Sequence, residues 1–351
     1  MIYKFDFWFN LKEVIIITIK KIAQLAGVSE GTVDRIIHNR GQVSQANIDK
    51  VNAIIKEHGY KKNIFASHLA FNKKFRFAVL VPDSKSVEYW DLPVKGIMKA
   101  AEEFSRFGVN LDYFYYEYNE ASFKEIAYTI FDEEFDGLLI APIFYEASVL
   151  FLNKCKEKNL KIVMIDSNIS SISDVAFTGQ NAYQSGLIAG RLSSFNLTRG
   201  NTILIVKITR EIESTSIYLE RIKGFYAFFK ENEAFSNVDL KELSIFDTKN
   251  MLLDVEVFKN VSTIFVPNSR VYIIAEFLKE NNLKDIFLVG YDLLDKNVNF
   301  LKEGYIDFLI NQKPDEQGYL GIEYLYKTVI LKENANLIQH VPVEIIVKES
   351  L

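Results

Sequence analysis

The sequence predicts an α/β protein in which a small all-α unit precedes a much larger part built from parallel sheets. Two short helical patterns, separated by a glycine-containing turn, lie between Thr18 and Arg40. From Arg76 onward, short apolar runs alternate with amphipathic helical patterns, which is typical of doubly wound parallel sheets. The expected strands are the runs 77–81, 137–141, 161–165, 202–208, 263–266 and 286–289, and the expected helices lie at about 93–107, 145–157, 182–195, 214–231 and 269–281. The chain of 351 residues is too long for one ordinary domain, so we expect two or three folding units.

Composition indicates a globular protein, with 49% hydrophobic and 25% charged residues. The single cysteine, Cys155, can form no intramolecular disulfide, which fits a reducing cytoplasm, and we expect it to be buried. No apolar run is long enough to span a bilayer, and residues 1–17 resemble neither a signal peptide nor an anchor. We expect a cytoplasmic protein with no membrane partner. Residues 1–17 are interpreted as an N-terminal extension, with a docking arm as the alternative.

Charge is distributed unevenly along the chain. Between Thr18 and Arg76, eleven Lys or Arg residues face four Asp or Glu residues, a net charge of +7. Because the whole chain carries −5, the remainder carries −12. A basic segment attached to an acidic body is typical of a module that binds a polyanion, although a solvated helix surface can also be charged.

The two helical patterns near the N-terminus have recognisable ends. Thr18 is a candidate N-cap, and Gly27 can adopt the left-handed conformation that ends a helix. Ser29 would cap a second helix, which buries the apolar stripe of Val33, Ile36 and Ile37. A helix, a glycine turn and a short helix with a polar free face have the shape that enters a DNA major groove. Other small helical domains share this pattern.

A third helix is expected after the loop that ends at Val43. Ser44 would cap it, Gly59 would end it, and its buried face comprises Ile48, Val51, Ile54 and Ile55. This helix would close a minimal core with the first two.

Specific motifs in this segment resemble the helix-turn-helix headpiece of the lac-repressor (LacI) family of bacterial regulators. They are Ala26-Gly27-Val28-Ser29, Thr32-Val33-Asp34-Arg35 and Val43-Ser44. The resemblance implies a DNA-binding domain at 18–62, a hinge helix and linker at 63–75, and an effector-binding and dimerisation domain at 76–351. The latter would be a two-lobed, periplasmic-binding-protein-like core. Lobe one would comprise about 76–178 and 313–339, and lobe two about 179–312 and 340–351.

The resemblance also assigns DNA contacts. Lysine and arginine side chains would bind phosphates, and Arg35 would make a bidentate contact with guanine. Leu69 would wedge between base pairs in the minor groove, as the family's N-x-x-A-x-x-L hinge pattern implies, although an amphipathic linker helix is the alternative. Asp34 and Lys62 depart from the family's usual serine and proline. The expected DNA-binding residues are Thr18, Lys20, Ser29, Glu30, Gly31, Thr32, Arg35, His38, Arg40, Ser44, Asn63, Ala66 and Leu69.

Polar side chains follow many of the apolar runs in the larger part. In open α/β sheets, ligands bind beyond the carboxyl ends of the strands, and carboxylates and amides there can pair with neighbouring hydroxyl groups of a sugar. Turn formation explains each such residue alone, above all Asp83 and Asn181. The strand-end residues are Asp83, Asp166, Gln180, Asn181, Asn268, Asp292 and Gln312.

Resemblance to the ribose-type sugar-binding proteins of the same superfamily selects among these positions. It adds Arg221 from an R-x-x-G-F motif and the aromatic pair Tyr89 and Trp90, of which Trp90 could instead anchor the core. Ser167 replaces an arginine that is common in the family, which counts against ribose and against an anionic ligand. The expected ligand-binding residues are Asp83, Tyr89, Trp90, Asp166, Asn181, Arg221, Asn268, Asp292 and Gln312.

No motif indicates catalysis, a metal or a cofactor. The four histidines and one cysteine show no metal-site spacing, and no nucleophile elbow or glycine-rich phosphate loop is present. An Asp166–Asp292 pair for glycoside hydrolysis would need an acid with a raised pKa, which no sequence feature supplies. We expect a ligand-responsive transcription factor that binds a palindromic operator as a homodimer and responds to a sugar. The alternatives are a sugar-transport component and a ligand-independent DNA-binding dimer.

Overall fold

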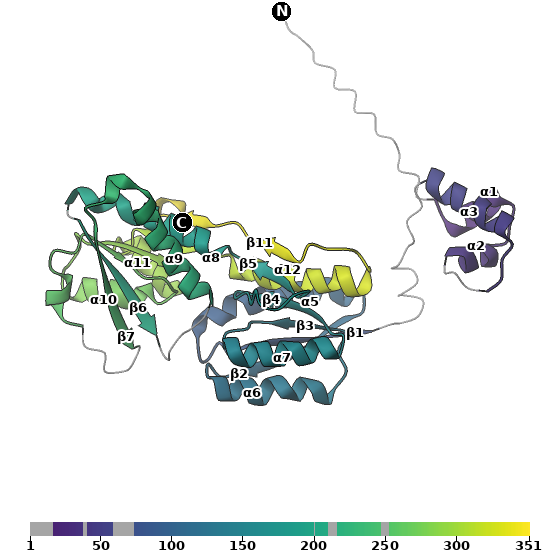
Figure 1. Cartoon of the computed structure of the whole chain (residues 1–351), viewed down its shortest axis with the longest axis horizontal. Helices are drawn as coiled ribbons and strands as arrows, with labels where there is room; N and C mark the ends of the chain where they lie inside the picture. The colour runs from purple at the N-terminus through teal and green to yellow at the C-terminus, as the bar shows by residue number, and fades with distance from the viewer. Residues whose placement is uncertain (1–16, 38–40, 59–73, 200, 210–215, 247–252) are drawn as a thin grey trace, which may run out of the picture. The chain divides into compact units, whose positions relative to one another are not determined.

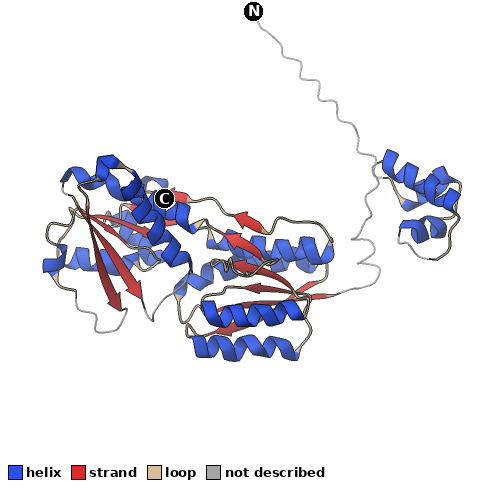
Figure 2. Ribbon diagram, in the orientation of Figure 1, coloured by secondary structure: helices blue, strands red, loops and turns tan. Residues whose placement is uncertain are grey.

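The computed structural model describes residues 17–37, 41–58, 74–199, 201–209, 216–246 and 253–351. The chain forms two compact units, residues 1–71 and residues 72–351, and each is described by itself (Figure 1). The described residues of the first unit form three helices, and those of the second form two mainly parallel sheets with helices on both faces (Figure 2). The predicted fold class, an all-α unit ahead of a two-lobed α/β core, is confirmed.

Local hydrogen bonds and backbone conformation set several helix ends in the first unit. They are α1 (Ile19–Ala26), α2 (Glu30–Ile37) and α3 (Gln45–Glu57). The Thr18 hydroxyl accepts a hydrogen bond from the Lys21 amide at 3.2 Å, and Gly27 ends α1 with a φ of 67°. The Ser29 hydroxyl accepts from the Thr32 amide at 3.1 Å. Ser44 precedes α3 without a side-chain cap, and Gly59 lies outside the described residues.

Among its described residues, the core of this unit is small and aliphatic. Ile22, Val33 and Val51, one from each helix, are fully buried at its centre. Ile17, assigned to the extension by the sequence analysis, is also buried in this core because its apolar side chain packs there. In contrast, Leu25 is 47% exposed on α1.

Lobe one of the second unit is built on a six-stranded sheet of order β11-β5-β4-β3-β1-β2. Helices α5 and α12 cover one face, and α6 and α7 cover the other (Figure 1). Cys155 is fully buried on α7. The strands are β1 (Phe75–Pro82), β2 (Val109–Tyr116), β3 (Gly137–Ile140), β4 (Lys161–Ile165), β5 (Ala176–Gly179) and β11 (Ile338–His340). The helices are α5 (Asp91–Ser105), α6 (Glu120–Thr129), α7 (Tyr145–Glu157) and α12 (Pro314–Leu325).

Lobe two repeats this plan with a sheet of order β12-β10-β9-β8-β6-β7. Its two faces carry separate apolar clusters, one with α10 and α11 and one with α8 and α9. Only β12 runs antiparallel to its neighbour among the described strands. The strands are β6 (Thr202–Thr209), β7 (Asp239–Phe246), β8 (Thr263–Phe265), β9 (Phe287–Tyr291), β10 (Phe308–Asn311) and β12 (Glu344–Ile346). The helices are α8 (Ala182–Ser193), α9 (Ser216–Glu231), α10 (Val271–Glu280) and α11 (Asp295–Glu303).

Both lobes therefore share the strand order 2-1-3-4-5, with one extra edge strand each. This order places a topological switch point beside the first strand of each sheet, where open α/β folds bind ligands. The chain passes between the lobes three times, from β5 to α8, from β10 to α12 and from β11 to β12.

Candidate functional site

A cavity lies between the two lobes at the carboxyl ends of their strands. It encloses about 550 Å³ of space, part of it open to solvent, which is within the range of small-molecule sites. Seven of the nine residues predicted to bind ligand line it: Tyr89, Trp90, Asp166, Arg221, Asn268, Asp292 and Gln312.

Asp166 directly follows β4 and contributes a buried carboxylate from lobe one. Its φ of 63° is left-handed, a conformation that costs energy for a residue other than glycine. Oδ1 accepts a hydrogen bond from the Tyr89 hydroxyl at 2.8 Å, and Oδ2 accepts from the Ser167 hydroxyl at 3.3 Å. Burial raises the pKa of Asp166, while the positive charge of Arg221 and the Tyr89 hydroxyl act in the opposite direction.

Asp292 occupies the equivalent position in lobe two, directly after β9. It too has a left-handed backbone, with a φ of 69°, and it is 1% exposed. The Gln312 amide nitrogen donates to both carboxylate oxygens at 2.9 Å. Burial raises the pKa of Asp292 to about 7, even though Arg221 and Gln312 both favour the ionised form. This group therefore changes charge near neutral pH.

Arg221 projects from α9 and supplies a buried positive charge, at 4% exposure. Its guanidinium donates to the Pro267 carbonyl at 3.1 Å and to the side-chain oxygen of Gln312, and it stacks over the Tyr291 ring at 4.1 Å from the centroid. The buried Nε has no hydrogen-bond partner among the described residues.

Close helix packing fixes the position of Arg221. A Cβ added at Gly186 on α8 would lie 2.0 Å from the Arg221 carbonyl oxygen. Only glycine at this position lets α8 approach α9 so closely, and the approach places the arginine side chain at the cavity.

The aromatic wall comes from the short 3₁₀ helix Glu88–Trp90 in lobe one. The Tyr89 and Trp90 rings meet edge to face, with centroids 5.2 Å apart and an interplanar angle of 83°. Trp90 is 2% exposed and belongs to the core of lobe one as well as to the cavity wall. The two interpretations of Trp90 are therefore compatible.

Asn268 lines the cavity, but its side chain already forms hydrogen bonds with the main chain. Its amide nitrogen donates to the Ile208 carbonyl at 2.7 Å, and its oxygen accepts from the Arg270 amide at 3.1 Å. A ligand would share these atoms.

Asp83 and Asn181, the other two predicted residues, do not line this cavity. The Asp83 carboxylate accepts from the Lys85 amide at 3.0 Å, as in a turn. The Asn181 side chain accepts from the Gln184 amide at 3.0 Å and caps α8. Both side chains thus have the local hydrogen bonds that strand-end Asp and Asn residues often make.

Several cavity residues were not predicted. Arg270 is 7% exposed and donates to the Ile208 carbonyl at 3.0 Å; its place two residues after Asn268 was the available signal. Tyr118 follows β2, a strand that the sequence analysis did not identify. The remaining unpredicted residues are Val87, Ile143, Ile217, Tyr218 and Ser269.

In the first unit, the predicted base-reading residues Glu30, Gly31 and Arg35 lie exposed on α2. The Ser29 and Thr32 hydroxyls are 2.9 Å apart, at the start of the same helix. Thr18, Lys20 and Ser44 are also exposed. Five further predicted DNA contacts lie outside the described residues: His38, Arg40, Asn63, Ala66 and Leu69.

The described residues lack two other kinds of feature. No group of three or more His, Cys, Asp or Glu side chains there could hold a metal ion. None of the helices in the same part of the chain has the length and apolarity needed to cross a membrane.

Comparison with known proteins links both units to one family. Residues 18–63 match the family described as bacterial regulatory proteins, lacI family, and residues 77–333 match the periplasmic binding protein domain. The ribose operon repressor of Escherichia coli (strain K12) is 27% identical over 323 residues, which cover 88% of this chain and 92% of the repressor.

Solved structures give the same result. A protein from Bacteroides fragilis described as a LacI transcriptional regulator is 30% identical, with a TM-score of 0.73, and the match covers 79% of this chain and 98% of that one. A glucose-galactose binding protein from Geobacillus stearothermophilus shares the fold, with a TM-score of 0.68 at 20% identity over 80% of this chain and 99% of that one. The predicted resemblance is confirmed: the chain belongs to the LacI family of DNA-binding transcriptional regulators, with a helix-turn-helix headpiece and a periplasmic-binding-protein-like core.

Proposed function

We propose that this regulator responds to a neutral monosaccharide that binds in the cavity between the two lobes. The observation that carries the proposal is the convergence of two buried carboxylates, a buried guanidinium and an aromatic wall in one cleft. Carboxylate oxygens accept from sugar hydroxyls, and arginine and glutamine nitrogens donate to them, so neighbouring hydroxyl groups can be bound in pairs.

Charge balance supports a neutral ligand. Above the pKa of Asp292, which is about 7, the carboxylates of Asp166 and Asp292 oppose Arg221 and Arg270, and all four are buried at the cavity. An anionic or cationic ligand would leave a net charge in this enclosed space, which is costly unless it is paired. The name of the ribose operon repressor supports the sugar class. Ser167 in place of the family's common arginine favours a sugar other than ribose.

The headpiece would bind double-stranded DNA at a palindromic operator, with two copies of the chain acting as a homodimer in the cytoplasm. The exposed residues of α2 would enter the major groove, where Arg35 can make a bidentate contact with guanine. Sugar binding would close the lobes and change operator affinity. The size of that change equals the difference between the sugar's affinities for the two states.

Thermal unfolding with a panel of neutral pentoses and hexoses, and with the matching sugar acids, tests the ligand proposal. A sugar that binds only the folded protein stabilises it by about 2.7 kcal/mol at a hundred times its Kd. We expect one neutral sugar, or a few, to raise the unfolding temperature. Stabilisation by sugar acids alone, or by no sugar, would contradict the proposal.

Electrophoretic mobility shift with DNA from the region upstream of the protein's own gene tests the DNA proposal. We expect specific binding that weakens steeply with salt, because phosphate contacts release counterions. Arg35→Ala should relax specificity by about 1–3 kcal/mol at the contacted base. Equal affinity for unrelated DNA would argue against an operator.

A further inference from the structure

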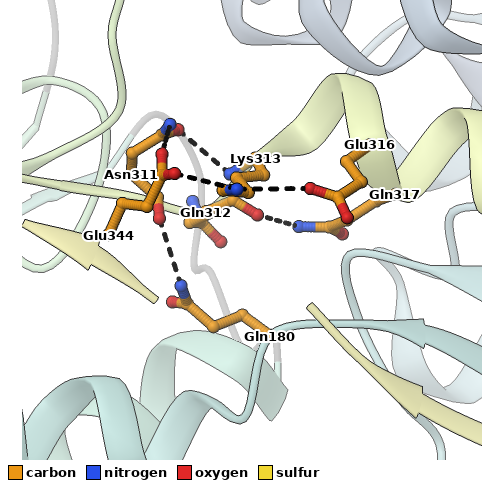
Figure 3. A network of polar contacts seen from close by, with 7 residues as sticks. All are labelled: Gln180, Asn311, Gln312, Lys313, Glu316, Gln317 and Glu344. Atoms are coloured by element: carbon orange, nitrogen blue, oxygen red, sulfur yellow. Dashed lines mark hydrogen bonds and ion pairs between the residues drawn. The ribbon is translucent and has the colours of Figure 1, made fainter. Parts of the chain in front are cut away.

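A chain of hydrogen bonds runs from the main chain of Asp166 in lobe one to the carboxylate of Asp292 in lobe two. Its middle member is Gln317, which is 1% exposed in the first turn of α12. The Gln317 side-chain oxygen accepts from the Asp166 amide at 3.0 Å. Its side-chain nitrogen donates to the Gln312 carbonyl at 2.9 Å, as Figure 3 shows. The Gln312 side chain then reaches Asp292 and Arg221.

Helix α12, which carries Gln317, is firmly attached to lobe one. It packs on α5 and on the central strands β3 and β4. A Cβ added at Gly96 on α5 would lie 1.7 Å from the Asp315 carbonyl oxygen, so the two helices are in direct backbone contact. Gln317 therefore has a fixed position relative to the sheet of lobe one.

The crossovers between the lobes meet at the other end of this chain of bonds. Asn311, just before Gln312, donates to Glu344 at 3.0 Å, and its carbonyl accepts from Gln180 at 3.3 Å. Lys313, just after Gln312, forms an ion pair with Glu344 at 2.8 Å and has a left-handed φ of 50°. Residues in or directly next to the three crossover segments are thus tied together beside Gln312 (Figure 3).

We propose that Gln317 is a positioning residue for the sugar site. Its side-chain amide fixes the position of Asp166 relative to Gln312, and through Gln312 it fixes the positions of Asp166 and Asp292 relative to each other. The inference rests on the proposed sugar-binding function. Only a side chain with both an acceptor and a donor can bind the Asp166 N–H and the Gln312 carbonyl at once. An ionised glutamate at this position would keep the first bond and replace the second by a repulsive contact.

The test is calorimetric titration with the sugar that stabilises the wild-type protein most, using Gln317→Met and Gln317→Glu. Gln317→Met removes both bonds at similar volume, and we expect the Kd to rise about tenfold, the scale of two ordinary hydrogen bonds. At pH 8, Gln317→Glu should bind the sugar as weakly as Gln317→Met does. Relative to wild type at each pH, its affinity should recover as the pH falls to 5, because the introduced buried carboxyl then gains a proton and can donate.

Asn196→Leu is the matched control, because Asn196 donates to the Ser262 carbonyl at 2.8 Å in lobe two and does not line the cavity. It should lower the unfolding temperature while the sugar Kd stays within about twofold, as expected of an ordinary lost bond remote from the ligand. Wild-type Kd values in both Gln317 variants would overturn this inference alone, as would an equal affinity loss in Asn196→Leu. Failure of the wild-type protein to bind any sugar would overturn the proposed function together with it.

Discussion

The two lobes have the same topology and each places one aspartate, with a left-handed backbone, directly after an equivalent strand. Their surroundings differ. In lobe one, hydroxyl groups of Tyr89 and Ser167 bind the Asp166 carboxylate beside an aromatic wall. In lobe two, the Gln312 amide binds Asp292, and the Arg221 guanidinium lies close enough to favour its ionised form.

This difference indicates a division of roles within one cleft. Lobe two supplies the Arg221 guanidinium and a carboxylate whose pKa is about 7, so it should dominate affinity and pH dependence. Lobe one supplies one carboxylate, Asp166, together with hydroxyl and aromatic groups, which orient a sugar at lower energetic cost. Equivalent backbone positions have therefore acquired different partners, and variants of each lobe should have distinguishable effects.

The largest expected effect is on the pH dependence of stability, and it belongs to lobe two. Because the pKa of folded Asp292 is about 7, the folded state keeps a proton that the unfolded chain releases near pH 4. Stability from this group is therefore lost as the pH rises from 4 to 7, by about 4 kcal/mol. Asp292→Asn should lack this loss in denaturant unfolding of the sugar-free protein. Parallel pH profiles for the two proteins would show that Asp292 titrates normally.

Loss of Arg221 should nearly abolish sugar binding. Arg221→Leu removes the charged donor that we propose for the sugar hydroxyls, and the loss of two such bonds costs about 3 kcal/mol, equivalent to at least a hundredfold in Kd. Titration calorimetry measures this loss of sugar affinity, and Arg191→Leu on the exposed surface of α8 is the control. A sugar Kd within about tenfold of the wild-type value would show that the guanidinium does not bind the sugar.

A substitution in lobe one should weaken sugar binding less than Arg221→Leu does. Tyr89→Phe removes the 2.8 Å hydrogen bond to Asp166 but keeps the aromatic ring. We expect the sugar Kd to rise about tenfold, since a hydrogen bond to a charged group contributes about 1.5 kcal/mol. An effect as large as that of Arg221→Leu would contradict the division between the lobes.

Asn181 should have the smallest effect on binding. Asn181→Ala removes the cap of α8 and should lower the free energy of unfolding by about 1 kcal/mol. The sugar Kd should stay at the wild-type value, because the side chain does not line the cavity. A weakened Kd with an unchanged unfolding free energy would instead assign Asn181 to ligand binding.

Local chemistry made much of the fold predictable. The Thr18 cap and the left-handed Gly27 follow from residue type alone, and both occur as expected. Strands buried on both faces read as apolar runs, so β4 was predicted over the same residues as observed. By contrast, β2 is fully buried only at its two ends, Val109 and Tyr116, and the polar and aromatic residues between them do not form an apolar run.

The site residues that could be predicted from the sequence are mainly those that directly follow a strand. Asp83 and Asp166 both follow strands, yet only Asp166 lines the cavity. The Asp83 carboxylate bonds to the Lys85 amide two residues away, which is the turn that the sequence analysis gave as its alternative. Gln317 lies on α12, a helix that the sequence analysis did not identify, and its bonds join residues 151 and 5 positions away. Contacts of that range arise from tertiary packing, which a single sequence does not display.

The most direct test of the account is operator affinity with and without the sugar, measured by fluorescence anisotropy on labelled upstream DNA. Wild type and Arg221→Leu carry the same headpiece, so only the sugar response should differ between them. We predict that saturating sugar shifts the wild-type Kd for DNA about fivefold or more, a typical allosteric coupling, and leaves the variant unchanged. An equal shift in both proteins, or no shift in wild type, would contradict the claim that a sugar in this cleft controls DNA binding.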